Sequence, residues 1–128
     1  MTKILSVGPV KIGGDNPLVL IAGPCVIENK EHTLALARAL QEITARGGIG
    51  FVFKASYDKA NRTSVKSYRG PGIDEGLEIL RAVKAETGLP VVSDVHDITQ
   101  VKAAAEVLDI VQIPAFLSRQ TDLLVAVG

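Results

Sequence analysis

The segment from 51 to 70, FVFKASYDKANRTSVKSYRG, begins with apolar residues and then becomes strongly basic. Only one acid, Asp58, lies between positions 54 and 69, where five basic residues occur: Lys54, Lys59, Arg62, Lys66 and Arg69. The whole chain, in contrast, balances 14 basic against 14 acidic residues. A guanidinium group binds phosphate or carboxylate in a bidentate manner, and an ammonium group binds them as a point charge. The segment therefore predicts a binding site for an anionic ligand.

The residues between these cations indicate a small ligand. Asn61, Thr63 and Ser64 add an amide and two hydroxyl groups that hydrogen-bond to phosphate. Two unit charges ~4 Å apart interact by roughly 4 kcal/mol at an effective dielectric constant near 20, so several cations together hold a polyanionic molecule. Nucleic acid would require a wider basic face with stacking aromatic rings, and Tyr57 and Tyr68 alone are weak support for one. The sequence has neither a Walker loop nor a GxGxxG motif, so the predicted ligand is a small, multiply charged metabolite.

Four short apolar runs are the candidate strands, at 18–24, 51–56, 91–96 and 109–115. Successive side chains of a strand point to opposite faces, and on one face each run starts apolar and finishes polar. The polar residues that finish these rows are Cys25, Lys54, Ser56, Asp94, His96 and Gln112. Parallel α/β folds bind their ligands at the carboxyl ends of the strands. We therefore expect the anion site at this rim.

Each of these residues also has a purely structural interpretation. Lys54 alone would extend past the strand end into solvent, and Asp94 would cap the next helix. Cys25 alone would be a small buried apolar side chain. Gln112 and His96 would hydrogen-bond to neighbouring backbone groups. Their convergence on one rim favours the functional interpretation.

Helices are predicted between the strands. Apolar residues recur with helical spacing at 36–43, 73–80 and 101–108, and glycines at 47–48 and 88 supply stop signals. Ser118 would cap a fourth helix over 120–127. Before the first long strand, Gly8-Pro9 predicts the turn of a short hairpin.

The repeated β/α pattern predicts an α/β fold with parallel strands. It is compatible with an open doubly wound sheet and with a (β/α)8 TIM barrel, which periodicity alone does not separate. Four β/α units are half of a barrel of roughly 250 residues. We therefore expect this chain to be part of a longer protein.

Bulk composition excludes several classes of protein. Hydrophobic residues make up 47% of the chain and aromatic residues 4%, as expected for a core of aliphatic strands and helices. The single cysteine favours a reducing, cytoplasmic environment. Apolar runs are shorter than a membrane-spanning helix requires, and the neutral charge gives no reason to expect binding to nucleic acid or to a membrane.

Five segments resemble the 3-deoxy-8-phosphooctulonate synthase family: IAGPCVIE, FKASYDKANRTS, SYRGPG, SDVHD and QIPAFLSRQTDLL. The resemblance covers nearly the whole chain. KANRTS with SYRGPG separates this family from the related 3-deoxy-arabino-heptulosonate 7-phosphate synthases, which usually read KPRTS. Members are (β/α)8 barrels, typically homotetrameric and about twice this length. The resemblance implies that residues 1–128 are a single domain, the N-terminal half of such a barrel with its hairpin and first four β/α units.

The resemblance also implies a reaction. The family condenses phosphoenolpyruvate with D-arabinose 5-phosphate, giving 3-deoxy-D-manno-octulosonate 8-phosphate and phosphate, in lipopolysaccharide biosynthesis. We expect the 128-residue chain alone to be inactive. Two alternatives remain at this point: an enzyme like the heptulosonate 7-phosphate synthases, and a non-catalytic half-barrel that binds sugar phosphates.

Roles follow by position from the resemblance. The implied catalytic residues are Lys54, Lys59 and Asp94. The implied phosphoenolpyruvate ligands are Lys54, Lys59, Gln112 and the Ala115 backbone. The implied arabinose 5-phosphate ligands are Asn61, Arg62 and Thr63, with Ser56 and Asp94 in the shared cavity. Phe116 and Arg119 resemble residues that reach the sugar phosphate of a neighbouring subunit.

The residue at position 25 bears on metal dependence. Metal-dependent members of the family have Cys here, and metal-independent members have Asn. The resemblance therefore implies that Cys25 binds a divalent metal ion, whose role would be to orient the aldehyde or organise water. The other ligands, a His, a Glu and an Asp, are expected outside this chain.

Overall fold

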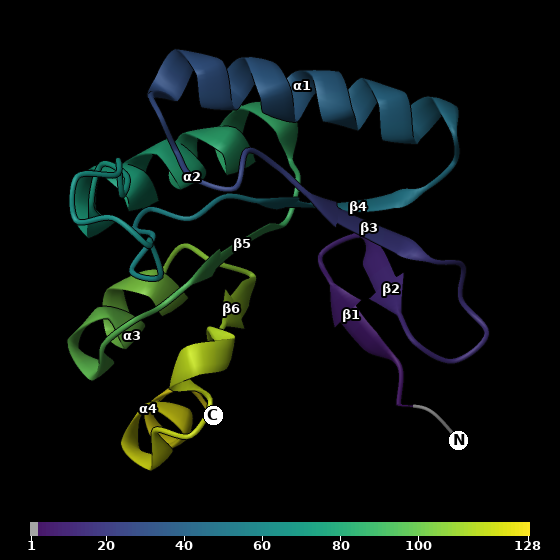
Figure 1. The fold of residues 1–128 in the computed structure, drawn as a ribbon. Coiled ribbons are helices and arrows are strands. Elements are labelled where there is room, and N and C mark those ends of the chain that lie inside the picture. The colour runs from purple at the N-terminus through teal and green to yellow at the C-terminus, as the bar shows by residue number, and fades with distance from the viewer. Residues whose placement is uncertain (1–2) are drawn as a thin grey trace.

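The computed structural model describes residues 3–128 (Figure 1). A hairpin is followed by four β/α units, as predicted. The elements are β1 (Leu5–Val7), β2 (Val10–Ile12), β3 (Val19–Ala22), α1 (Lys30–Arg46), β4 (Gly50–Lys54), α2 (Ile73–Thr87), β5 (Val91–Asp94), α3 (Ile98–Ala105), β6 (Ile110–Gln112), the 3₁₀ turn η1 (Ala115–Leu117) and α4 (Thr121–Val127). No helix within residues 3–128 has the length and apolar character needed to cross a membrane.

Strands β3, β4, β5 and β6 form one parallel sheet in chain order, because each crossover returns the chain beside the strand it has just left. Helices α1 and α2 lie side by side on one face of this sheet (Figure 1). The main core lies between them and the sheet, where Phe53, Val91 and Leu80 are fully buried. The β1–β2 hairpin packs near the start of β3 and β4.

Local signals explain where the helices begin and end. Asn29 precedes α1, and its side-chain oxygen accepts the His32 N–H at 2.8 Å. Gly88 ends α2 in a left-handed conformation with φ 69°, which confirms the predicted stop. The predicted cap at Ser118 is wrong, because Gln120 directly precedes α4. The Ser118 hydroxyl instead donates to the Ala115 carbonyl at 2.7 Å and closes η1.

The end of β3 departs from regular alternation. Ala22 pairs with Phe53 and Val26 with Ser56, so three residues on one side match two on the other. Cys25 lies in this bulge with φ 42°. Strand alternation predicted that Cys25 points to the same face as Ile21. Because of the bulge, alternation does not determine the direction of the Cys25 side chain. The bulge also brings two backbones together: a Cβ on Gly23 would lie 1.7 Å from the carbonyl oxygen of Lys54, so glycine is required there.

Candidate functional site

Polar residues at or just after the ends of all four parallel strands lie at the same edge of the sheet. This edge is the rim formed by the carboxyl ends of the strands. Lys54, Asp94 and Gln112 are the last residues of β4, β5 and β6. Strand register pairs Asp94 with Gln112, and Lys54 with Val92, two residues before Asp94. Cys25 follows β3 at this edge, and its carbonyl accepts the Ser56 N–H at 3.0 Å.

Asp94 is the centre of the most densely bonded group at this rim. Its residue is only 5% exposed, so the carboxylate needs partners inside the protein. The Ser56 hydroxyl donates to Oδ1, and His96 Nε2 lies 3.1 Å from Oδ2. Asp94 is not a helix cap, because Asp97 performs that function for α3 by accepting the Thr99 N–H at 2.8 Å.

These partners keep the Asp94 carboxylate ionised. Burial by itself raises the pKa of Asp94, but hydrogen bonds from His96 and Ser56 and the positive charges of His96 and Lys59 outweigh it. The pKa of Asp94 falls to about 2. At neutral pH this group therefore accepts hydrogen bonds and supplies negative charge, and it has no proton to donate. Lys59 therefore contributes positive charge to the surroundings of Asp94.

The depressed pKa of Asp94 predicts acid sensitivity. A carboxyl group with a folded pKa near 2 and an unfolded pKa of about 3.9 stabilises the fold above about pH 4, by roughly 2 kcal/mol, and this contribution disappears as pH falls toward 2. Urea unfolding of the protein and of Asp94→Asn at several pH values should give free energies that converge in this window. Ser56→Ala, which removes one donor, should show an intermediate difference, and parallel curves would contradict the prediction.

His96 also belongs to this group; the sequence placed it in the polar row with Asp94 but indicated no specific role for it. Its side chain is 9% exposed, and its backbone N–H donates to Gln100 Oε1 at 2.9 Å. The buried Tyr57 hydroxyl donates to the same oxygen, also at 2.9 Å. Burial, then the negative charges of Asp94 and Asp58, raise the pKa of Tyr57, so its hydroxyl remains a donor. No prediction from the sequence concerned Gln100. The signal that could have found it is its position three residues after Asp97, the cap of α3.

Residues 55–72 form the loop between β4 and α2, called the basic loop. One of its own cations stabilises it. Arg69 donates to both carboxylate oxygens of Asp58, at 2.9 and 2.7 Å, and is therefore occupied. The other cations of the segment, Lys54, Lys59, Arg62 and Lys66, form no ion pair among residues 3–128. They remain available to an anionic ligand.

The predicted sugar-phosphate ligands lie farther out than the Asp94 group. Asn61, Arg62 and Thr63 are exposed on the loop. Arg62 Nε donates to the Tyr68 carbonyl at 3.3 Å, which orients the guanidinium group along the loop. Within the described chain no hydrogen bond links these three residues to Asp94 or its partners.

The residues predicted to act near a neighbouring subunit lie in and after η1. Ala115 begins this turn. Phe116 is 53% exposed, and the centroid of its ring lies 6.5 Å from that of His96, so it borders the Asp94 group. Arg119 is exposed two residues beyond η1. The structure therefore brings Phe116 to the rim and leaves Arg119 at the surface.

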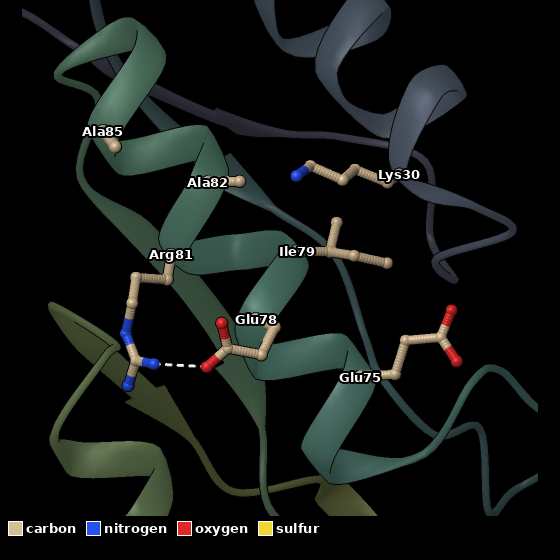
Figure 2. Close-up of a pocket in the computed structure, with 7 residues that line it drawn as sticks. All are labelled: Lys30, Glu75, Glu78, Ile79, Arg81, Ala82 and Ala85. Atoms are coloured by element: carbon tan, nitrogen blue, oxygen red, sulfur yellow. Dashed lines mark hydrogen bonds and ion pairs between the residues drawn. The ribbon is translucent and has the colours of Figure 1, made fainter.

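Two cavities help to delimit the site. One of about 400 Å³ lies on the outside between α1 and α2, where Lys30 extends toward Ile79 and Ala82 (Figure 2). None of the rim residues lines it, so we do not assign it to the site. A second cavity, of about 230 Å³, is lined by His96, Leu117 and Gln120 and adjoins the rim.

Cys25 is the one predicted metal ligand in this chain. Its side chain is exposed and its thiol is free, which leaves the sulfur accessible. Thiolate sulfur suits transition metals such as zinc or iron. Residues 3–128 contain no cluster of three or more His, Cys, Asp or Glu side chains able to hold a metal ion. A metal bound at Cys25 would therefore need ligands from outside this chain.

Comparisons with known proteins show the family to which the chain is similar. The DAHP synthetase I family matches residues 2–128. The chain is 64% identical over 128 residues to 2-dehydro-3-deoxyphosphooctonate aldolase of Syntrophotalea carbinolica, covering 100% of this chain and 46% of that protein. The protein of the same name from Geobacter sulfurreducens is 65% identical over 128 residues, covering 100% of this chain and 47% of the relative. The Geotalea uraniireducens protein is 65% identical over 126 residues, 98% of this chain and 46% of its own length. The chain thus spans about half the length of these curated relatives.

Proposed function

This chain belongs to the DAHP synthetase I family, and from that membership we propose that the whole protein condenses phosphoenolpyruvate with D-arabinose 5-phosphate. The products are 3-deoxy-D-manno-octulosonate 8-phosphate and phosphate. The relatives at 64–65% identity are named for a phosphorylated eight-carbon 2-keto-3-deoxy acid, which supports the eight-carbon product. The chain would form the N-terminal half of a (β/α)8 barrel.

One structural observation carries the proposal: Lys54 ends β4 at the rim that holds Asp94 and has no carboxylate partner in the described chain. Lys59, likewise without a carboxylate partner there, adds positive charge to the surroundings of Asp94. Their ammonium groups are suited to the carboxylate and phosphate of phosphoenolpyruvate, with Gln112 and the Ala115 backbone completing that pocket. Fixed cations overcome the repulsion between two anionic substrates and stabilise charge while the carbon–carbon bond forms.

The second substrate would lie between the rim and the loop. Arg62 would bind its phosphate, with Asn61 and Thr63 beside it. Asp94 remains ionised and has two oxygens fixed by Ser56 and His96. We propose that its remaining lone pairs accept a hydrogen bond from a substrate hydroxyl and so orient the sugar, while Lys59 balances the charge.

The activity test measures phosphate release by the whole protein. Release is expected only when phosphoenolpyruvate and arabinose 5-phosphate are both present, because phosphate leaves only after the two are joined. Each substrate alone is the control. Equal turnover with erythrose 4-phosphate would move the protein to the heptulosonate synthases, and absence of turnover with either aldose would favour a non-catalytic binding protein.

We also propose that Cys25 is a ligand of a divalent metal ion. When bound, the metal would orient the aldehyde or organise water. Cys25→Asn is expected to weaken metal affinity by at least about tenfold, because a thiolate is replaced by a neutral amide. Metal content per chain, measured after dialysis at fixed free metal, checks this without an activity assay. Unchanged stoichiometry and chelator sensitivity would remove Cys25 from the ligand set.

The assembly and cellular role are part of the same proposal. A homotetramer would allow Phe116, exposed at the rim, and Arg119, exposed beyond it, to reach the sugar phosphate bound by a neighbouring subunit. The eight-carbon product would be made in the cytoplasm for lipopolysaccharide biosynthesis.

A further inference from the structure

Two neighbouring residues after β4 form hydrogen bonds on opposite sides of the sheet, one to the end of β5 and the other to α3. Ser56 and Tyr57 lie two and three residues after the end of β4, and because they are adjacent they point to different faces. Ser56 donates to Asp94 on the rim side. Tyr57 points into the helix-covered core, where it is fully buried, and donates to Gln100 of α3.

Gln100 connects Tyr57 to His96. Its Oε1 accepts the Tyr57 hydroxyl and the His96 backbone N–H, both at 2.9 Å. An amide oxygen has two lone pairs, and two donors here require oxygen at this position. Gln100 is itself fixed, since its backbone N–H donates to the Asp97 carbonyl at 3.1 Å in the first turn of α3.

The hydrogen bond from the His96 backbone to Gln100 affects the position of the His96 imidazole ring. Only Val95, His96 and Asp97 separate β5 from α3, so the conformation of His96 depends on how its backbone is held. The ring reaches Asp94 through Nε2 at 3.1 Å and packs edge-on to Tyr57 at 6.3 Å between centroids. Its other nitrogen, Nδ1, is buried and has no hydrogen-bond partner in the described chain. Apart from the Nε2 contact with Asp94, the ring is therefore positioned by the backbone anchor and by packing.

We propose that Gln100 is a positioning residue for the Asp94–His96 pair: it holds the His96 backbone so that the imidazole orients the carboxylate that faces the substrates. The inference rests on the proposed function, because the pair matters for catalysis only if the rim is the active site. Gln100 touches no reacting group and acts through His96.

A merely structural alternative makes a different prediction. Gln100 occupies the third position after the cap Asp97, where a glutamine commonly reaches back to the N–H of the cap residue and stabilises the helix. Here it reaches one residue farther, to His96. If capping were its only role, its loss would lower stability without changing the reaction.

The test compares Gln100→Leu, Gln100→Glu and a control in the whole protein. Gln100→Leu leaves the His96 N–H and Tyr57 hydroxyl without an acceptor, so kcat should fall by about tenfold or more while KM for phosphoenolpyruvate changes less than about twofold. Gln100→Glu keeps an oxygen at a helix N-terminus, where a carboxylate is favoured, and should restore kcat to within about threefold of wild type.

Gln41→Leu is the matched control, because Gln41 donates to the Thr87 carbonyl at 2.7 Å, away from the rim. It should lower Tm and leave kcat unchanged.

A second readout does not need activity. In ¹⁵N-histidine-labelled protein, the His96 imidazole signal, assigned with His96→Gln, should shift in Gln100→Leu and remain as in wild type in Gln41→Leu. A Gln100→Leu protein that loses stability but keeps wild-type kcat and the wild-type His96 signal would overturn the proposal. If wild-type protein lacks condensation activity, the proposed function fails, and the imidazole signal alone decides whether Gln100 positions His96.

Discussion

Lys54→Met in the whole protein is expected to lower kcat/KM for phosphoenolpyruvate by about a hundredfold or more. Lys54 ends β4 and is half-buried, so its ammonium group is partly shielded from water. It has no carboxylate partner among residues 3–128, which leaves its charge for a ligand. Removing it would leave an anionic group of the substrate without its counter-charge in a partly desolvated site, where such a loss is costly.

Steady-state kinetics and calorimetric titration with phosphoenolpyruvate measure this effect. Lys11→Met is the matched control, because Lys11 is an exposed cation of the hairpin, which packs near the start of β3 and β4, and it has no assigned role. It should change kcat/KM by less than about twofold, since an exposed charge is screened by water and salt. Wild-type kinetics in Lys54→Met would remove Lys54 from the binding site and, with it, the main electrostatic argument for this rim.

The isolated 128-residue chain is expected to show no turnover. β3 and β6 are the edges of its parallel sheet, so each presents unpaired backbone groups. Apolar side chains are also exposed: Leu18 by 92%, Ile21 by 47% and Val125 by 75%. In the proposed barrel the remaining strands would cover these surfaces and supply the remaining substrate and metal ligands.

Phosphate release by equal molar amounts of the isolated chain and the whole protein tests this prediction. Size-exclusion chromatography with light scattering should show that the isolated chain self-associates, because exposed edges and apolar patches favour pairing between copies. Turnover by a monomeric isolated chain at a rate comparable to that of the whole protein would show that this half contains a sufficient active site.

Much of the fold could be predicted from the sequence because its determinants are local. Short apolar runs predicted the four strands, and helical spacing with Gly88 predicted α2 and its end. The failure at Ser118 has a local cause as well, since a hydroxyl that can cap a following helix can equally close the preceding turn. The bulge at Cys25 was missed because it depends on the match between two strands, which alternation along one strand does not contain.

By itself, the sequence determined that the chain is an α/β repeat with polar residues at the carboxyl ends of its strands and a basic segment after β4. These properties follow from the order of residue types along the chain. Only the tertiary structure decided which side chains meet: that Asp94 binds Ser56 and His96, that Arg69 is already paired with Asp58, and that Gln100 links Tyr57 to His96. The physical reason is that these contacts join residues from different β/α units, or depend on the conformation of the loops between them. Strand register and helix packing fix those distances, and neither is encoded in any single local pattern.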